Sequence, residues 1–256
     1  MEVLNVKQLL EYKAPSESPI IGGGILYPGT RMFLYGRYKS LKSMLAIDLA
    51  FCIAHGIPWL DYKTKRSRVM VVQMEIPKAM FRKRIERYCR NGYAIPDNLY
   101  FINEPYLKLD RDVGLQKLEA ALRAFNPDVL IIDPLYKVLS GNINDHQPVE
   151  IFQSNIDKLK EQFSLSIIII AHPRQRLLSS TGLVLDMGAD EFMGSSNWPN
   201  WADTIIKVTR DSDYSPFITL AFQVMRHWEP TGDEDEEMQP IRAKMTSFLH
   251  WRRLND

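Results

Sequence analysis

The stretch Met32-Phe-Leu-Tyr-Gly36-Arg-Tyr-Lys-Ser-Leu-Lys42-Ser43 decides the fold. Its first four residues predict a strand, and the apolar pattern over Ser43–Ala54 that follows predicts a helix. Between them, Gly36 to Ser43 matches the phosphate-binding pattern G-x-x-x-x-G-K-S/T at the first glycine, the lysine and the serine. The sequence therefore predicts a nucleotide-binding loop, against the alternative of a basic strand–helix turn that arose by chance.

The residues kept in this loop have a chemical role. Backbone N–H groups and the N-terminus of the helix would surround the β-phosphate. Lys42 would neutralise the β- and γ-phosphate oxygens, and the Ser43 hydroxyl would bind Mg²⁺. The second glycine of the pattern is Leu41, at a point where glycine allows unusual dihedral angles, and Lys39 adds a further positive charge. We expect ATP to contact Gly36, Lys39, Ser40, Leu41, Lys42 and Ser43.

Two further apolar strands end in carboxylates. Val129–Ile132 leads into Asp133, and Val69–Met74 leads into Glu75. An acid at the carboxyl end of a parallel strand lies in the crevice beside the phosphate-binding loop. There Asp133 would bind Mg²⁺, directly or through water, and Glu75 would be the general base for the attacking water. The alternatives are an aspartate that caps the next turn and a glutamate that starts a helix before Pro77.

The same alternation of strands and helices continues outward from this stretch. Uniformly apolar strands separated by helices predict an α/β fold, with a mostly parallel sheet and helices on both faces. After Asp203, strand patterns joined by polar turns, one of them the acidic run Asp233–Glu237, predict antiparallel strands at a sheet edge. These strands are expected at Thr204–Val208, Phe217–Val224 and Ala243–Trp251. We expect a short helix and linker over residues 1–28, and one ATPase domain over residues 29–256.

Composition sets outer limits on function. The net charge of +1 gives no global reason to expect nucleic acid or membrane as a partner, so any DNA site must come from local basic patches. Cys52 and Cys89 lie in apolar helical patterns and predict reduced thiols. The N-terminus lacks the apolar core of a secretory signal, and the apolar run Ile167–Ala171 is too short to span a bilayer. We therefore expect a cytoplasmic protein without a membrane partner.

With these motifs in place, the sequence resembles the RecA-superfamily ATPases, most closely the RepA-like plasmid and phage hexameric helicases and the AAA_25 ATPases. The resemblance implies a RecA-like P-loop fold. In that group a polar γ-phosphate sensor ends the strand after the aspartate-bearing one, and here this residue is His172, which follows four isoleucines and Ala171. A structural role is the alternative for this histidine. The resemblance covers about Pro28 to Arg226, and its specific stretches are Lys39–Ser43, Ala50–Leu60, Val69–Glu75 with Phe81–Arg84, Val129–Leu135, Ile167–His172, Gly194–Ser196 and Ala202–Asp203.

The resemblance also implies an arginine that reaches into a neighbouring subunit. Hexameric members resemble Phe222–Gly232, where a lysine and an arginine two residues apart contact the neighbour's nucleotide. Arg226 matches that arginine, whereas the lysine position is Val224 and the arginine of the group's Arg-Gly-Ser segment is Met193. Arg226 is therefore the candidate arginine finger, with Arg210 behind it, and a surface arginine on an edge strand is the alternative.

DNA contacts are implied in the same way. In this superfamily the loops after the aspartate and sensor strands face a central channel, and here they are Tyr136–Gln147 and Pro173–Phe192. The second loop carries Arg174 and Arg176, which would contact the backbone of single-stranded DNA. Further basic surface, which equally fits a solvated helix face or a subunit interface, is found at Lys63–Arg68 and Lys78–Arg90.

The leading hypothesis is a Mg-ATP-dependent DNA helicase or translocase of a phage or plasmid replication system. It would form a hexameric ring, hydrolyse ATP between subunits, and work with a replication loader or primase in a bacterial or archaeal host cell. A second hypothesis is a RecA-like recombinase or recombination mediator that forms filaments. A third is a nucleotide-binding regulatory module with weak hydrolysis, which the departures at Leu41, Met193 and Val224 favour.

Overall fold

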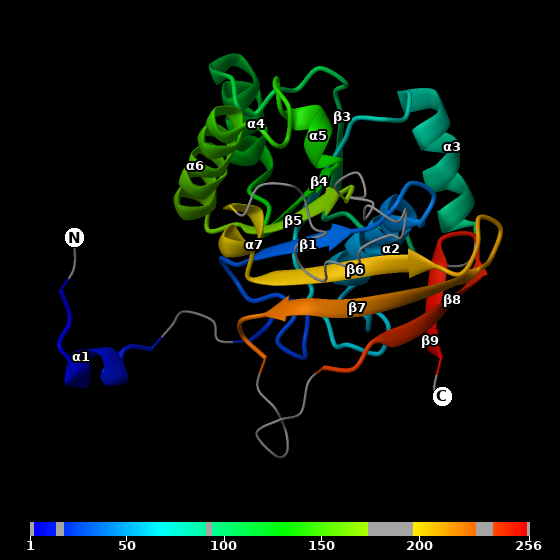
Figure 1. The fold of residues 1–256 in the computed structure, drawn as a ribbon, viewed down its shortest axis with the longest axis horizontal. Coiled ribbons are helices and arrows are strands. Elements are labelled where there is room, and N and C mark those ends of the chain that lie inside the picture. Colours follow the sequence, from blue (N-terminus) through cyan, green and yellow to red (C-terminus); the bar gives the residue numbers. More distant parts are fainter. Residues whose placement is uncertain (1–2, 14–17, 91–93, 174–196, 229–237, 255–256) are drawn as a thin grey trace, which may run out of the picture.

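The computed structural model describes residues 3–13, 18–90, 94–173, 197–228 and 238–254. Within these residues the chain builds one nine-stranded sheet in the order β3-β2-β4-β5-β1-β6-β7-β8-β9 (Figure 1). The strands are β1 (Arg31–Tyr35), β2 (Val69–Gln73), β3 (Leu99–Asn103), β4 (Val129–Asp133), β5 (Ser166–Ala171), β6 (Thr204–Arg210), β7 (Phe217–Met225), β8 (Ile241–Ser247) and β9 (His250–Leu254).

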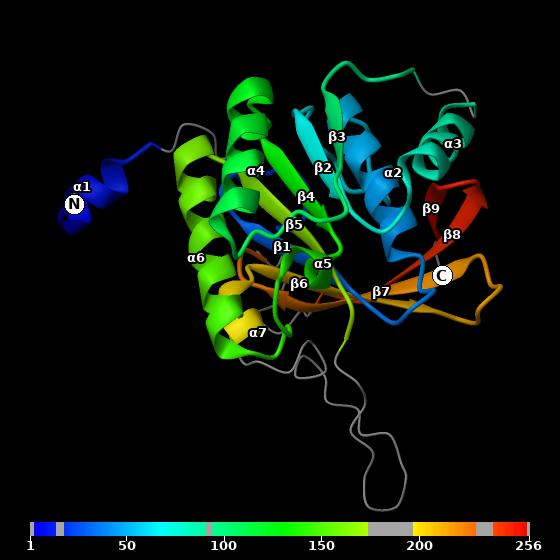
Figure 2. The ribbon, with the colours of Figure 1, turned by 90° about the horizontal axis from the view of Figure 1, so that it is seen from above.

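Helices cover both faces of the parallel part of this sheet (Figure 2). Helices α4 and α6 lie on one face, and α2 lies on the other, with α3 on the same side as α2. Helix α1 stands away from the rest of the chain in both views and has no buried residue. The helices are α1 (Val6–Glu11), α2 (Lys42–His55), α3 (Lys78–Cys89), α4 (Asp112–Phe125), α5 (Leu135–Val138), α6 (His146–Phe163) and α7 (Asn197–Trp201).

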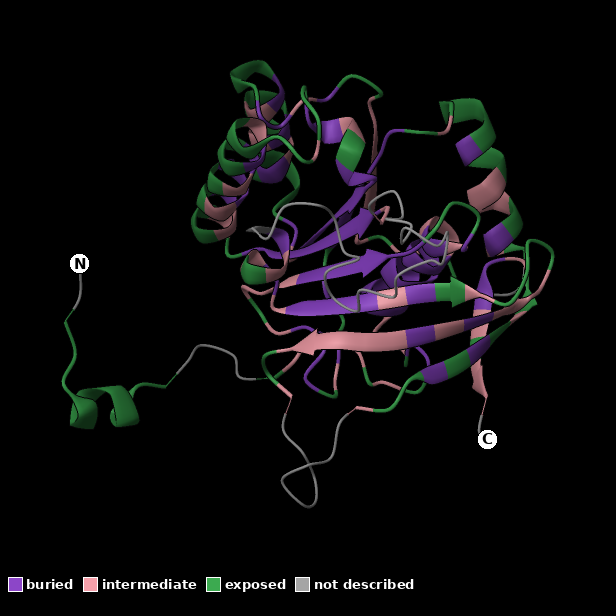
Figure 3. Ribbon diagram, in the orientation of Figure 1, coloured by how far each residue is buried: buried purple, intermediate pink, exposed green. Residues whose placement is uncertain are grey.

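The fold class predicted from the sequence is confirmed. Strands β3, β2, β4, β5, β1 and β6 are parallel neighbours, and β7, β8 and β9 extend the sheet in antiparallel fashion from β6. The central strands are buried on both faces, which Figure 3 shows as continuous purple arrows. In β1, Met32 and Leu34 pack in the cluster on the α2 side, whereas Phe33 and Tyr35 pack with α4 and α6.

One predicted element is wrong in its extent. The sequence predicts a single strand over Ala243–Trp251, but the chain turns at Leu249 and forms the two strands β8 and β9. Leu249 has a left-handed backbone conformation with φ of 67°, and its side chain is buried against α2 and α3. The strand pattern hides this turn because the turn residue Leu249 itself belongs to the core.

Two further observations concern the sequence-based expectations. Cys52 is buried in α2, Cys89 is the last residue of α3, and both are free thiols. Among the described residues, no helix combines the length and the apolar character that a membrane crossing requires.

Candidate active site

Strand register brings the predicted residues to one edge of the sheet. Tyr35 pairs with Ala171, so Gly36 and His172 leave neighbouring strands side by side. Gln73, the last residue of β2, pairs with Asp133, the last residue of the neighbouring strand β4. Glu75 follows β2 by two residues, and it therefore leaves the sheet beside Asp133. All of these strands are parallel, and their carboxyl ends therefore meet at a common crevice.

The predicted phosphate-binding loop joins β1 to α2. Its first residue has to be glycine, since a Cβ on Gly36 would lie 2.2 Å from the Val208 carbonyl oxygen of β6. Leu41 adopts φ of 69° and ψ of 15°, the left-handed conformation that glycine takes without strain, and it immediately precedes α2. The loop therefore keeps a glycine-like backbone at this position and holds it with a leucine, which costs about 1–2 kcal/mol.

Lys42 is folded into the loop. Its Nζ donates to the carbonyl oxygens of Gly36 at 2.6 Å and Arg37 at 2.8 Å, and it lies 3.3 Å from Ser40 Oγ. Only 4% of the residue is exposed. Burial lowers the pKa of Lys42 to about 8, against the opposing effect of the Asp133 and Glu75 carboxylates. The ammonium group is thus held where incoming phosphate oxygens would replace carbonyl oxygens as its partners.

Ser43 and Asp133 form a pair of oxygen ligands. Ser43 Oγ donates to Asp133 Oδ1 at 3.1 Å. Burial raises the pKa of Asp133 to about 6, while the Ser43 hydroxyl opposes the shift and Glu75 adds to it. Hydroxyl and carboxylate oxygens are the ligand types that Mg²⁺ prefers, and the ion is commonly held by one or two carboxylates together with substrate phosphates. The donor set therefore fits Mg²⁺ bound with a nucleotide.

Glu75 has a partner that the sequence did not suggest. Tyr136, in the short helix α5 that follows Asp133, donates its hydroxyl to Glu75 Oε1 at 2.6 Å. Partial burial and this hydrogen bond raise the pKa of Tyr136 above its ordinary value. The Tyr136 ring meets the His172 ring edge to face, with the centroids 5.7 Å apart. Glu75 and His172 are therefore connected through one aromatic side chain, and the segment Tyr136–Gln147, expected to be a loop, starts inside a helix.

Arg84 is a second residue that sequence reasoning missed. The sequence placed it among the charges of a basic helix, but its side chain is half-buried and interacts electrostatically with Asp133 and Glu75. Burial lowers its pKa, and the two carboxylates oppose that shift. A signal existed in the sequence, because Arg84 lies three residues after Phe81 and four before Tyr88, which are the buried residues of α3.

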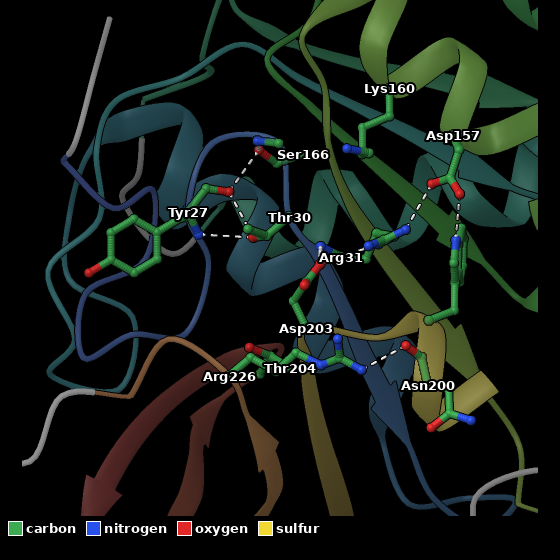
Figure 4. Close-up of polar contacts among 12 residues, drawn as sticks. Tyr27, Thr30, Arg31, Asp157, Lys160, Ser166, Asn200, Asp203, Thr204 and Arg226 are labelled. Atoms are coloured by element: carbon green, nitrogen blue, oxygen red, sulfur yellow. Dashed lines mark hydrogen bonds and ion pairs between the residues drawn. The ribbon is translucent and has the colours of Figure 1, made fainter. Parts of the chain in front are cut away.

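The two candidate finger arginines lie at opposite ends of the sheet. Arg210, at the end of β6, donates through Nη1 to the Lys39 carbonyl oxygen at 3.2 Å, while Lys39 pairs with Asp213 at 2.9 Å. Arg226 follows β7 beside the start of β6 and donates to the Asn200 carbonyl oxygen at 2.6 Å (Figure 4). Arg210 therefore supports the loop of its own chain, and Arg226 is not part of that site.

A pocket of about 380 Å³ adjoins the loop on its β6 side. Positive side chains and the aromatic ring of Tyr38 line it, together with carboxylates from the turn after β6. Arg174, Arg176 and Met193, as well as nearly all of the predicted channel loop Pro173–Phe192, lie outside the described residues. The acidic run Asp233–Glu237 does so too.

The chain is similar to a known family in sequence and to solved structures in fold. The family model AAA_25, described as an AAA domain, matches residues 4–176. No curated protein sequence matches the chain. Among solved structures, one that is described as an ATPase domain is similar with a TM-score of 0.61 and 13% identity, over 90% of this chain and 86% of that one.

Two further structures are similar over most of this chain. A DnaB-like replicative helicase, solved in a study of its interactions with primase, has a TM-score of 0.62 and 14% identity, over 98% of this chain and 67% of that one. The RadB recombinase has a TM-score of 0.58 and 12% identity, over 89% of this chain and 92% of that one. At these identities the likeness shows a shared fold.

Proposed function

The chain belongs to the AAA_25 family of AAA domains and is a RecA-superfamily P-loop ATPase, and on this premise we propose that it is an ATP-driven DNA helicase or translocase. It hydrolyses Mg-ATP between the subunits of a hexameric ring and serves the replication of a phage or plasmid. The observation that carries the proposal is the convergence of Lys42, Ser43, Asp133, Glu75 and His172 at one sheet edge.

The chemistry follows from these positions. Lys42 exchanges the loop carbonyl oxygens for the β- and γ-phosphate oxygens of ATP, so that its charge offsets the charge that develops during transfer. Ser43 and Asp133 would hold Mg²⁺, which would supply positive charge against the phosphate groups. Glu75 orients the attacking water and accepts its proton once the Tyr136 hydroxyl releases the carboxylate.

His172 and Arg84 complete the site from two sides. The His172 ring contacts the ring of Tyr136, the partner of Glu75, and burial lowers its pKa while the charges of Lys42 and Glu75 act on it in opposite directions. It therefore senses the γ-phosphate and transmits its presence through Tyr136. Arg84, on α3, interacts electrostatically with Asp133 and Glu75, and it stabilises negative charge on the transferred phosphoryl group.

The assembly and the DNA contacts extend the proposal beyond one chain. Arg226 lies at the far end of the sheet from its own Lys42, the arrangement that an arginine serving a neighbouring copy requires. Arg174 and Arg176 follow His172 in the segment after β5, and they contact single-stranded DNA. A primase or a loader is the expected replication partner, because one similar structure comes from a helicase that interacts with primase.

The deciding measurement is steady-state ATP hydrolysis with Mg²⁺, with and without single-stranded DNA, beside a Lys42→Ala control. Turnover that rises with DNA and is lost in the control supports a DNA-dependent motor, and unwinding of a forked duplex then identifies a helicase. Hydrolysis that ignores DNA, with no unwinding, contradicts the motor. Electron microscopy with DNA separates the closed ring from the filament that a recombinase would form.

A second candidate function rests on Leu41. Its left-handed conformation strains the loop, and Lys42 is bound to loop carbonyl oxygens. If this state persists with nucleotide bound, the chain is a nucleotide-binding regulatory module with weak hydrolysis. Nucleotide binding without turnover, measured with and without DNA, identifies that function.

A further inference from the structure

A buried polar cluster lies behind the active site and takes no part in the chemistry described above. Tyr88 of α3 donates its hydroxyl to Asp48 Oδ1 of α2 at 3.0 Å. His250, the first residue of β9, stacks on the Tyr88 ring with centroids 4.1 Å apart, and its Nε2 lies 3.2 Å from the Tyr88 carbonyl oxygen. His250 Nδ1 is 4.0 Å from Asp48 Oδ1, so three elements meet at these side chains.

The cluster is enclosed by apolar side chains. Asp48 is 5%, Tyr88 0% and His250 8% exposed, and the surrounding core contains Ile47, Phe51, Phe81 and Leu249. Burial raises the pKa of Asp48 to about 8 and lowers the pKa of His250. Both groups are therefore neutral at pH 7, and the cluster is a set of neutral hydrogen bonds whose partners cannot be replaced by water.

Helix α3 has few buried side chains that hold it against the rest of the protein. Of its twelve residues only Phe81 and Tyr88 are buried. A groove of about 660 Å³ runs between α3 and the edge strand β3, lined largely by apolar side chains such as Ile85, Leu99 and Phe101. The helix is thus only partly supported along its β3 side, and the Tyr88 hydroxyl is its buried polar link to α2.

The position of helix α3 also determines where active-site residues lie. It begins three residues after Glu75, and Arg84 lies one turn before Tyr88 on the same face. A shift of α3 relative to α2 would move Arg84 away from Asp133 and Glu75, while Lys42 and Ser43, which start α2, would stay in place. Misplacement by about 1 Å is enough to cost a large factor in rate.

We propose that Asp48, Tyr88 and His250 form a buried latch that fixes α3 on α2 and β9, and thereby positions Arg84 and Glu75 for hydrolysis. This rests on the proposed function of the site as an ATPase. The three are positioning residues, since none of them contacts a residue that binds nucleotide in our scheme. A directional hydrogen bond sets one arrangement of the two helices, whereas apolar contacts alone tolerate sliding.

The test compares Tyr88→Phe, which removes only the hydroxyl, with Tyr100→Phe, which removes a hydroxyl from β3 on the opposite side of the sheet. We expect Tyr88→Phe to speed amide hydrogen exchange across Lys78–Cys89 about three- to tenfold, because the variant loses one neutral hydrogen bond. We expect kcat to fall by a similar factor with the Kd for nucleotide unchanged. Tyr100→Phe should match the wild type in all three measurements.

A second variant separates positioning from simple stability. Asp48→Asn keeps a neutral side chain of the same shape that accepts the Tyr88 hydrogen bond, so it should retain kcat, whereas Asp48→Ala should behave like Tyr88→Phe. The groups that face Asp48 are Tyr88 from α3, His250 from β9 and Cys52 from its own helix.

The pH dependence of melting gives an independent readout. Unfolded Asp48 ionises near its ordinary pKa, while folded Asp48 stays protonated up to about pH 8, so the wild type loses stability between these values as pH rises. The Tm of Asp48→Asn relative to wild type should therefore increase from pH 5 to pH 8 and level off above.

Two results would overturn the latch. One is unchanged exchange over Lys78–Cys89 in Tyr88→Phe, and the other is faster exchange with an unchanged kcat, which would leave the cluster a structural feature only. If the wild-type chain binds ATP but does not hydrolyse it, the ATPase proposal fails. The exchange of α3, which needs no turnover, then still decides whether the latch holds the helix.

Discussion

Leu41 has the backbone conformation of a glycine and the core packing of a leucine. The loop needs a left-handed backbone just before α2, and the leucine side chain also packs against the core on the α2 side of the sheet. The sequence alone shows that Leu41 replaces the second glycine of the phosphate-binding pattern. Whether the loop keeps its backbone could not be predicted, because a residue's φ is set by contacts from β6 and α2 as much as by its own preference.

Leu41→Gly should raise nucleotide affinity. Glycine takes the left-handed conformation without the strain of about 1–2 kcal/mol that leucine has there, so the loop keeps its binding-competent backbone more readily. The Kd for ATP should therefore fall by about five- to thirtyfold. The Kd for ATP is to be measured by equilibrium binding with Mg²⁺ present.

The matched control is Leu41→Ala, which removes the same packing but keeps a Cβ at positive φ. It should lose thermal stability without gaining affinity. Equal affinities for the two variants would show that strain at residue 41 does not limit binding.

Among elements, the strands of the parallel sheet were the most predictable. Two strands show this best, because both of their faces are apolar, as expected in a covered parallel sheet: Val129–Asp133 and Ser166–Ala171. The first ends in a polar residue and the second leads directly into one, so both strands end at the crevice. For helix α3, the sequence did not predict which of its charged residues faces inward. The row of charges in α3 resembles a solvated surface, and only tertiary packing shows that Arg84 turns inward. Tyr136 and His250 escaped notice for the same reason, since each acquires its role from a residue distant in sequence.

Arg84→Ala should lower kcat by about 10²-fold, as expected for the loss of one group that stabilises transition-state charge, with a small effect on the Kd for ATP. Steady-state hydrolysis and equilibrium nucleotide binding test this.

Arg82→Ala is the control for Arg84→Ala, because Arg82 lies two residues away on the same helix, is exposed and pairs with Glu86. Its kcat should match that of the wild type. An equal loss in both variants would mean that the positive charge of the helix as a whole matters, rather than the position of Arg84.

At the scale of the whole molecule, the sheet separates the phosphate-binding loop from the proposed arginine finger. The phosphate-binding loop lies at the carboxyl end of β1, and Arg226 lies by the opposite end, next to the Arg31–Asp203 ion pair (Figure 4). The order of strands that produces this separation was not predictable from the sequence. Strand order depends on which crossovers pack best, and periodicity identifies strands without saying which ones are neighbours.

Mixing two inactive variants tests whether Arg226 serves a neighbouring copy. Lys42→Ala and Arg226→Ala should each lose ATPase activity alone. A mixed assembly contains interfaces with an intact Lys42 from one subunit and an intact Arg226 from the next, so hydrolysis should partly return. Size-exclusion chromatography must show that both variants assemble like the wild type. No recovery on mixing well-assembled variants would place Arg226 outside the neighbour's site.

The proposed latch also has a consequence during synthesis of the chain. His250 is 162 residues from Tyr88 along the chain. A ribosome that adds about 5–20 residues per second needs roughly 8–30 s to bridge that interval. Asp133 is made 45 residues after Tyr88. From that point the nascent chain carries its phosphate-binding loop, both carboxylates and Arg84, yet lacks the strand that would complete the proposed latch. With the latch as proposed, translation itself would delay ATP hydrolysis until the C-terminal hairpin has been made.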